Sequence, residues 1–128
     1  MSTATSDNQL LRVYQIDGTL VLTPSADLRE FEFDQIEAAA DVTLRRVDSG
    51  EIKNVVIDFR ETDFYGSTAL AFFVKLWKRV KSAGGRLAFC NVSAHEREIL
   101  EITHLNTLWP LCESLPDALA VVARRGEP

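Results

Sequence analysis

Apolar residues along this chain recur in short continuous runs that alternate with longer stretches of helical spacing. The first two runs, residues 10–16 and 19–23, flank Asp17-Gly18, a dipeptide typical of the tight turn in a β-hairpin. A third run, residues 55–59, is short and rich in β-branched side chains, which indicates a buried strand. The pattern therefore predicts a hairpin near the start of the chain and a buried strand near its middle.

Helical spacing appears in four segments between and after these runs. The expected helices cover residues 28–47, 67–83, 94–103 and a last segment that starts at Ser114. Ser93 and Glu96 have the spacing of a capping box, which marks the start of the third helix. Residues 86–91 predict another buried strand, and residues 108–111 predict a short edge strand.

Strands that alternate with helices predict an α/β domain with parallel strand pairs, and the opening hairpin makes the sheet mixed. We expect four or five strands with the helices packed against them. A chain of 128 residues is long enough for one domain with one core. That domain is expected to cover residues 10–123, between a flexible N-terminal tail of residues 1–9 and a C-terminal tail of residues 124–128.

The second helix follows the central strand after a polar corner at residues 60–67. At about 100° per residue, its core-facing side is expected to hold Leu70, Phe73, Val74, Trp77 and Val80. Its opposite side is expected to hold Thr68, Phe72, Lys75 and Arg79. Ser67 has the place and the hydroxyl of an N-cap residue, and Thr68 is expected to face solvent in the first turn. On spacing alone, the simpler interpretation is that these two residues only start a helix.

Composition and charge narrow the classes of function. Apolar residues make up 46% of the chain and charged residues 26%, which is ordinary for a soluble globular protein. A net charge of −5 without a basic cluster argues against nucleic-acid binding. No apolar run is long enough to span a membrane, and the polar N-terminus lacks a secretory signal, so we expect a cytoplasmic protein. Cys90 and Cys112 fit free thiols better than a disulfide in that compartment.

Patterns typical of catalytic or metal sites are missing from the sequence. It contains no glycine-rich phosphate loop, no GxSxG elbow and no HExxH pattern. His95 and His104 have no ligand partner at a metal-binding spacing, and both are interpreted as surface residues. Asp58, near the end of the central strand, could bind a ligand or cap the loop that follows. We therefore expect no enzymatic activity, no metal and no cofactor.

The second helix offers a surface instead. Phe72 on its solvent side and Leu76 on its flank are apolar groups that the core does not obviously need. Exposed apolar groups beside a helix N-terminus are typical of a site for a protein partner. The alternative is that a neighbouring segment of the chain covers them.

Taken in order over residues 10–122, these motifs resemble the STAS domain, the family of anti-sigma factor antagonists. The centre of that family reads F-I-D-S-S-G-L between a strand and a helix, and residues 64–70 here read FYGSTAL. The GGRL strand entry at residues 84–87, the helix after Val92-Ser93 and the end at residues 108–119 are similar to its later pattern. No single piece is specific, whereas the ordered set along the chain is.

The resemblance implies a single STAS-like domain that acts as an interaction module and not as an enzyme. In that family, an anti-sigma-type kinase phosphorylates a serine or threonine at the helix start, and the unmodified form binds that kinase. The resemblance places this residue at Thr68, with Ser67 before it, and the family's acidic residue after the second strand at Asp27. The expected partner surface comprises Asp27, Gly66, Ser67, Thr68, Phe72, Lys75, Leu76 and Arg79.

The corner departs from the family pattern at two positions. Gly66 stands where the family has an aspartate, and Ala69 stands where it has a glycine. The aspartate is usual in members that their kinase modifies, so the resemblance leaves phosphorylation of Thr68 open. Two alternative functions also remain open, an accessory subunit of an ABC-type lipid transporter and a sensor of a small ligand or nucleotide. A homodimer is left open as well.

Overall fold

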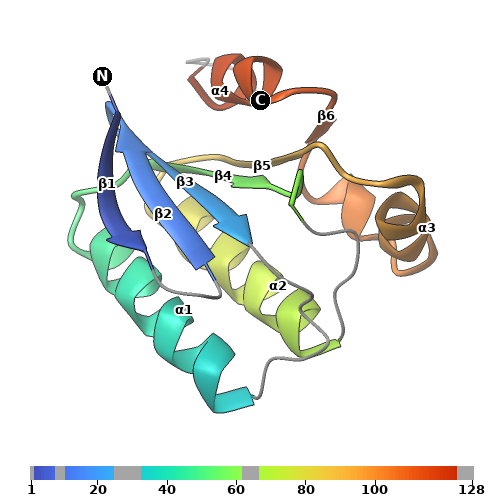
Figure 1. Ribbon diagram of the computed structural model, residues 1–128, viewed down its shortest axis with the longest axis horizontal. Coiled ribbons are helices and arrows are strands. Elements are labelled where there is room, and N and C mark those ends of the chain that lie inside the picture. Colours follow the sequence, from blue (N-terminus) through green and yellow to red (C-terminus); the bar gives the residue numbers. More distant parts are fainter. Residues whose placement is uncertain (1, 8–10, 25–32, 62–66, 124–128) are drawn as a thin grey trace.

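A single mixed sheet of six strands runs through the described part of the protein, and its spatial order follows the chain (Figure 1). The computed structural model describes residues 2–7, 11–24, 33–61 and 67–123. The strands are β1 (Ser2–Asp7), β2 (Leu11–Ile16), β3 (Thr19–Pro24), β4 (Asn54–Asp58), β5 (Leu87–Cys90) and β6 (Leu111–Cys112). The first three strands pair antiparallel, and β3 to β6 pair in parallel.

Helices cover both faces of this sheet. They are α1 (Phe33–Asp48), α2 (Ser67–Ser82), α3 (Ala94–Ile102) and α4 (Leu115–Ala123), with a short 3₁₀ helix at Leu105–Thr107. Figure 1 shows α1 and α2 side by side along one face, whereas α4 lies on the opposite face. No described helix has both the length and the apolar character that crossing a membrane requires.

Alternating side chains of the strands build two separate hydrophobic clusters. On β4, Val55 and Ile57 belong to the larger cluster beneath α1 and α2, and Val56 belongs to the smaller one beneath α4. Asp58 continues the alternation and lies on the α4 side, opposite Cys90 at the end of β5. The sheet therefore places a carboxylate at the carboxyl end of its central parallel strand.

Local signals in the sequence are confirmed at several turns. β2 and β3 form the predicted hairpin, and Asp17 at its turn adopts the left-handed region with φ 53°. Gly50, two residues after the end of α1, adopts φ 85°, a conformation that favours glycine. Ser93 accepts the backbone N–H of Glu96, and the Glu96 side chain accepts the backbone N–H of Ser93, which completes the predicted capping box.

The N-terminal segment is more ordered than the sequence predicts. Ser2–Asp7 forms β1 and pairs antiparallel with β2, so the expectation of a flexible tail over residues 1–9 is wrong for residues 2–7. The same strand takes the sheet beyond the four or five strands expected. Its residues are mostly polar and carry no strand pattern of their own. The edge of β2 supplies the hydrogen-bond partners that make this segment extended.

The central helix is rotated relative to the sequence prediction. Its most buried residues are Phe73, Leu76 and Val80, at 2%, 0% and 0% exposure. The other residues assigned to its core side are only partly buried: Leu70, Val74 and Trp77. The prediction that Leu76 lies on an accessible flank is therefore wrong. Both stripes have spacings of three and four residues, so periodicity alone could not separate them.

The last strand of the sheet also differs from the sequence prediction. The last strand lies at Leu111–Cys112, later than the predicted residues 108–111. Trp109, which falls inside that predicted strand, is 2% exposed and belongs to the larger hydrophobic cluster. The apolar run at residues 108–111 therefore supplies a core residue, Trp109, ahead of the strand, and the edge strand predicted for these residues begins only at Leu111.

Candidate functional site

The polar corner that follows β4 starts from a buried carboxylate. Asp58 ends β4 and is 0% exposed. Its Oδ1 accepts the backbone N–H of Arg60 at 3.1 Å and the side-chain amide of Asn91 at 2.9 Å. Arg60 Nε lies 3.2 Å from Oδ2, although no described donor makes an aligned hydrogen bond to that oxygen. Asp58 therefore caps the loop, one of the two roles that its position in the sequence allows.

The end of β5 completes this polar group. Cys90 is the register partner of Asp58 and is fully buried. Burial, and next the negative charge of Asp58, raise the pKa of the Cys90 thiol to about 12. Asn91 follows at φ 57°, in the left-handed region that asparagine enters more readily than most residues. Its side-chain amide thereby crosses from β5 to Asp58 on β4.

Because the pKa of Cys90 is raised, the free energy of unfolding should change with pH in the alkaline range. The thiol has a pKa of 9.0 when unperturbed and about 12 when folded, so its contribution is complete below pH 9 and is lost as the pH rises toward 12. We expect the unfolding free energy of the wild type to fall, relative to Cys90→Ala, by up to about 1.4 kcal/mol per pH unit above that point. Urea titrations of both proteins on either side of pH 9 measure this difference. Parallel curves for the two proteins would contradict it.

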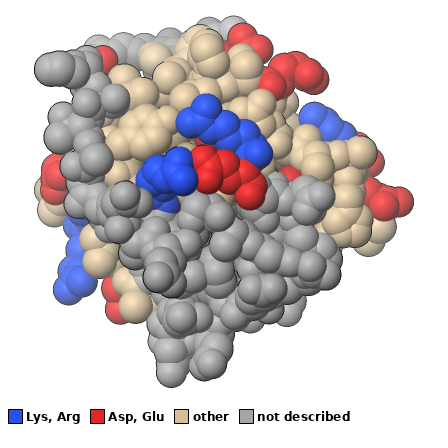
Figure 2. Space-filling model, in the orientation of Figure 1, with Lys and Arg blue, Asp and Glu red and all other residues tan. Residues whose placement is uncertain are grey.

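An ion pair ties the corner to β2. Arg12 donates two hydrogen bonds to the carboxylate of Glu61, at 2.7 and 2.9 Å. Tyr14, next on the same side of β2, has a raised pKa because it is partly buried; Arg60 opposes this shift and Asp58 adds to it. Figure 2 shows charged groups of both signs side by side at the centre of this face. Exposed pairs contribute about 0.2–1 kcal/mol, so this one orients the corner more than it stabilises the fold.

The corner leads into α2, which carries most of the predicted partner surface. Ser67 is the first residue of α2, whereas the sequence predicts it as the N-cap before the helix. Thr68 follows in the first turn. Phe72, one turn later, is half-buried, and its ring centroid lies 5.8 Å from that of Phe73. Lys75 is exposed. The expectation of a fully solvent-facing Phe72 is therefore only partly met.

Two other residues of the predicted surface make contacts within the protein. Leu76 is fully buried in the larger hydrophobic cluster and cannot contact a partner. Arg79 Nη1 lies 2.5 Å from Oδ2 of Asp48 at the end of α1, so its charge joins α2 to α1. Leu76 therefore leaves the predicted partner surface, whereas the Arg79 side chain is 44% exposed and stays within reach of a partner. Asp27 and Gly66 lie outside the described residues.

Sequence reasoning singled out Asp58 but missed the neighbours that hold it. Arg60 is two residues away in the chain, whereas Cys90 and Asn91 come from the next parallel strand. One signal was available for the latter two, because the carboxyl ends of parallel strands meet at the same edge of a sheet. Polar residues that follow two such strands can therefore be paired before the fold is known.

The described part of the protein does not gather metal ligands. In residues 2–7, 11–24, 33–61 and 67–123, no three His, Cys, Asp or Glu side chains are arranged to hold a metal ion. His95 and His104 are exposed, as the sequence predicts. Cys90 and Cys112 are register partners on β5 and β6 and are free thiols.

Comparison with known proteins places this architecture in a family. Residues 10–118 match the STAS domain. The chain is 28% identical over 110 residues to the putative anti-sigma factor antagonist BtrV of Bordetella bronchiseptica, covering 86% of this chain and 91% of that protein. A STAS domain anti-sigma-factor antagonist from Planctomyces limnophilus has a TM-score of 0.73 at 28% identity, over 89% of this chain and 98% of that one.

SpoIIAA, another anti-sigma factor antagonist, shares the fold in two states. Its unphosphorylated form has a TM-score of 0.75 at 15% identity, over 92% of this chain and 98% of that one. Its phosphorylated form, from Bacillus, has a TM-score of 0.71 at 14% identity, over 88% and 98%. The predicted α/β class, the mixed sheet with its opening hairpin and the resemblance are confirmed. The match over most of its length shows that this chain belongs to the STAS domain family.

Proposed function

We propose that this protein is a signalling module of the anti-sigma factor antagonist type, which docks on an anti-sigma-type serine/threonine kinase and is switched by phosphorylation of Thr68. One observation carries the proposal. α2 begins with Ser67 and Thr68, directly after the corner whose first residues Asp58 holds. In the antagonists that this chain resembles, the phosphorylated residue occupies this helix start. The relatives named as antagonists support the same class of function.

A phosphate on Thr68 would be stabilised where it forms. The first amides of an α-helix have no partner inside the helix, and the helix dipole favours negative charge at this end. The first turn of α2 contains no acidic residue that would repel a phosphate. Phosphorylation would add a charge of about −1.5 to −2 without requiring a change of fold.

The same phosphate would weaken docking. Phe72 and Lys75 follow Thr68 by one and two turns of α2, so the three positions share one side of the helix. A kinase that packs on Phe72 and places an acid near Lys75 would also have to desolvate the phosphate and meet its charge. Asp27, Gly66 and Arg79 remain proposed parts of this surface, whereas the buried Leu76 does not.

Replacing Thr68 with glutamate should weaken kinase binding by at least about tenfold, equivalent to about 1.4 kcal/mol. The glutamate carboxylate imitates part of the phosphate charge at the same helix position. Tagged wild type, Thr68→Glu and Thr68→Ala are used side by side to capture proteins from a lysate of the source cell, with identification by mass spectrometry. Calorimetry with the purified partner then gives the affinities. Thr68→Ala is the matched control and should still bind.

Several results would contradict this proposal. If transporter subunits were captured in place of an anti-sigma-type kinase, the chain would be assigned to transport. Equal binding of wild type and Thr68→Glu would remove the switch. A large drop in the thermal midpoint of Thr68→Glu would show that residue 68 is buried.

Phosphorylation itself can be tested with the purified kinase and ATP. The tryptic peptide of residues 61–75 should then carry the phosphate on Thr68, and the Gly66→Asp variant should be phosphorylated faster than the wild type.

A further inference from the structure

The two cysteines of this chain are far apart in the sequence and adjacent in the fold. Cys90 ends β5, Cys112 ends β6, and the two are register partners in this parallel pair of strands. Backbone hydrogen bonds fix the pairing on both sides of Cys90. The N–H of Phe89 donates to the carbonyl oxygen of Pro110 at 3.0 Å. The N–H of Asn91 donates to the carbonyl oxygen of Cys112 at 3.3 Å.

Both thiols lie on the same face of the sheet. Cys90 belongs to the smaller hydrophobic cluster on the α4 side, and Cys112 packs against that cluster. Neighbouring strands of a sheet are about 4.8 Å apart. The Cα atoms of a disulfide are usually separated by about 4.4–6.8 Å. The sheet therefore holds two free thiols at a backbone separation that a disulfide can bridge.

The two sulfur atoms differ in how easily a reagent can reach them. Cys90 is 0% exposed, whereas Cys112 is half-buried at the edge of the sheet. A reagent from solvent therefore meets the sulfur of Cys112 first. The sulfur of Cys90 is then placed to attack Cys112 from inside the protein, as the second thiol of a pair does in disulfide exchange.

The environment keeps both thiols protonated at neutral pH. Burial raises the pKa of Cys90 to about 12, and it also raises the pKa of Cys112, with a further contribution from the charge of Asp117. Because the thiolate is the nucleophile, exchange at these sulfurs should be slow at neutral pH. The slow rate does not decide which form prevails at equilibrium, since that depends on the reduction potential of the pair.

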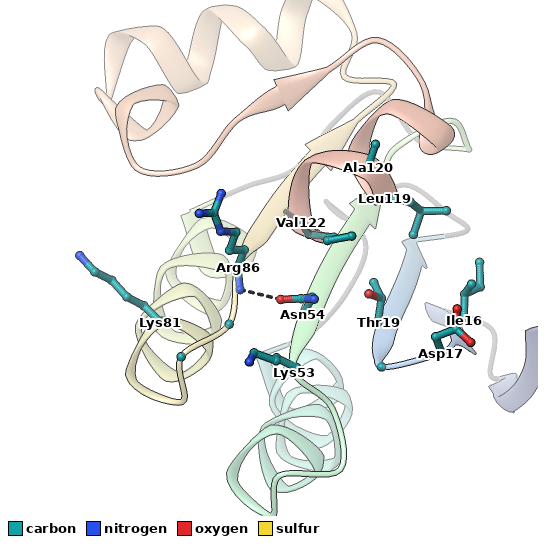
Figure 3. Close-up of a pocket in the computed structure, with 14 residues that line it drawn as sticks. Ile16, Asp17, Thr19, Lys53, Asn54, Lys81, Arg86, Leu119, Ala120 and Val122 are labelled. Carbon is teal, nitrogen blue, oxygen red and sulfur yellow. Dashed lines mark hydrogen bonds between the residues drawn. The ribbon is translucent and has the colours of Figure 1, made fainter. Parts of the chain in front are cut away.

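A bond between these strands would join the edge of the sheet that leads into α4. β6 has only two residues, and α4 starts at Leu115, shortly after Cys112. Ala118 and Val122 of α4 lie in the same cluster as Cys90. Figure 3 shows Val122 near Asn54 at the start of β4, so α4 extends over this face from β6 to β4. A covalent bond at Cys112 would thus hold the start of α4 on the sheet.

We propose that Cys90 and Cys112 form a reversible disulfide with a small disulfide, such as glutathione disulfide, as the oxidant, and that this bond locks β6 to β5. The Cys112 thiolate attacks one sulfur of glutathione disulfide, whose S–S bond breaks, and one glutathione leaves and takes up a proton. Cys90 then loses its proton and attacks the sulfur of Cys112, which releases the second glutathione. The two cysteines lose two electrons, and glutathione disulfide is reduced to two thiols.

The pairing of β5 with β6 carries this inference, and the function proposed above is not needed for it. Equilibration of the full wild-type chain in mixtures of reduced and oxidised glutathione tests it, with free thiols alkylated after an acid quench. Trypsin places Cys90 in residues 87–97 and Cys112 in residues 98–124, so the disulfide appears in mass spectrometry as a linked peptide pair that a reductant separates.

The equilibrium constant for the disulfide should be at least about tenfold higher in the native protein than in the same chain unfolded in concentrated urea, because the strand register brings the two thiols together. An equal or smaller constant in the native protein would overturn the proposal. Accumulation of the mixed disulfide at Cys112 without the linked peptides would also overturn it.

Two single variants test the order of the steps. Cys90→Ala should stop at the mixed disulfide between Cys112 and glutathione. Cys112→Ala, the matched control, should react with glutathione disulfide at least about tenfold more slowly, because its remaining thiol is buried. The reverse order of rates would overturn the assignment of Cys112 as the first thiol. The equilibrium measurement on the wild type stands without either variant.

Thermal unfolding of the wild type tests the lock. The disulfide closes a loop of residues 90–112, which restricts the unfolded chain, so the oxidised protein should have a thermal midpoint at least about 5 °C above that of the reduced protein. Adding a reductant should reverse the shift, and Cys112→Ala treated in the same way should show none. A lower midpoint for the oxidised wild type would show that the bond strains the sheet and does not lock it.

Discussion

Replacing Trp109 with alanine should lower the free energy of unfolding by about 3–5 kcal/mol, the cost of truncating a buried aromatic residue. Trp109 is 2% exposed, and its ring centroid lies 4.7 Å from that of Phe89 in the larger hydrophobic cluster. Its indole N–H donates to no described residue, so the stabilisation comes from packing. Urea denaturation at neutral pH measures the loss.

Two other substitutions make this prediction specific. Trp109→Phe keeps an aromatic ring and removes the unpaired N–H, so it should cost clearly less than Trp109→Ala. Trp77→Ala should also cost less, about 1–2 kcal/mol, because Trp77 is only partly buried on α2. If Trp77→Ala proves the more damaging of the two alanine substitutions, then the burial of these tryptophans is the reverse of what the structure shows.

Sequence reasoning succeeds where the signal is local. Signals confined to a few neighbouring residues were interpreted correctly, as in the Asp17 turn and the capping box of Ser93 and Glu96. Such features depend on local backbone geometry and hydrogen bonds, which the residues themselves determine. The order of most strands and helices follows from the same kind of signal.

Features that depend on distant contacts were not accessible in this way. α2 is apolar on more than one side: the sequence correctly predicts burial of Phe73 and Val80, but only the packing of the folded helix shows that Leu76 joins them. β1 is a strand because β2 offers it an edge. The candidate site shows the same division, because the sequence identifies Asp58 as a capping residue or a ligand, whereas its partner Asn91 arrives from another strand.

Replacing Asp58 with alanine should lower the free energy of unfolding by about 3 kcal/mol. The substitution leaves the Asn91 amide and the Arg60 N–H without their acceptor in a partly buried place, and each unsatisfied donor costs about 1–3 kcal/mol. Asp58→Asn keeps an acceptor of the same shape and loses only the ion pair with Arg60, so it should cost less. Urea denaturation of the three proteins gives these differences.

A double-mutant cycle with Asn91→Gly separates the side-chain contact from other effects of Asp58→Ala. Glycine tolerates the left-handed backbone of residue 91 while removing its amide, so the change isolates the hydrogen bond to Asp58. The coupling between the two substitutions should lie between about 0.5 and 3 kcal/mol. A coupling near zero would show that Asn91 does not hold Asp58. Because Asp58 also fixes the first residues of the corner, a real coupling would mean that β5 helps to position the start of α2, where the proposed switch residue Thr68 lies.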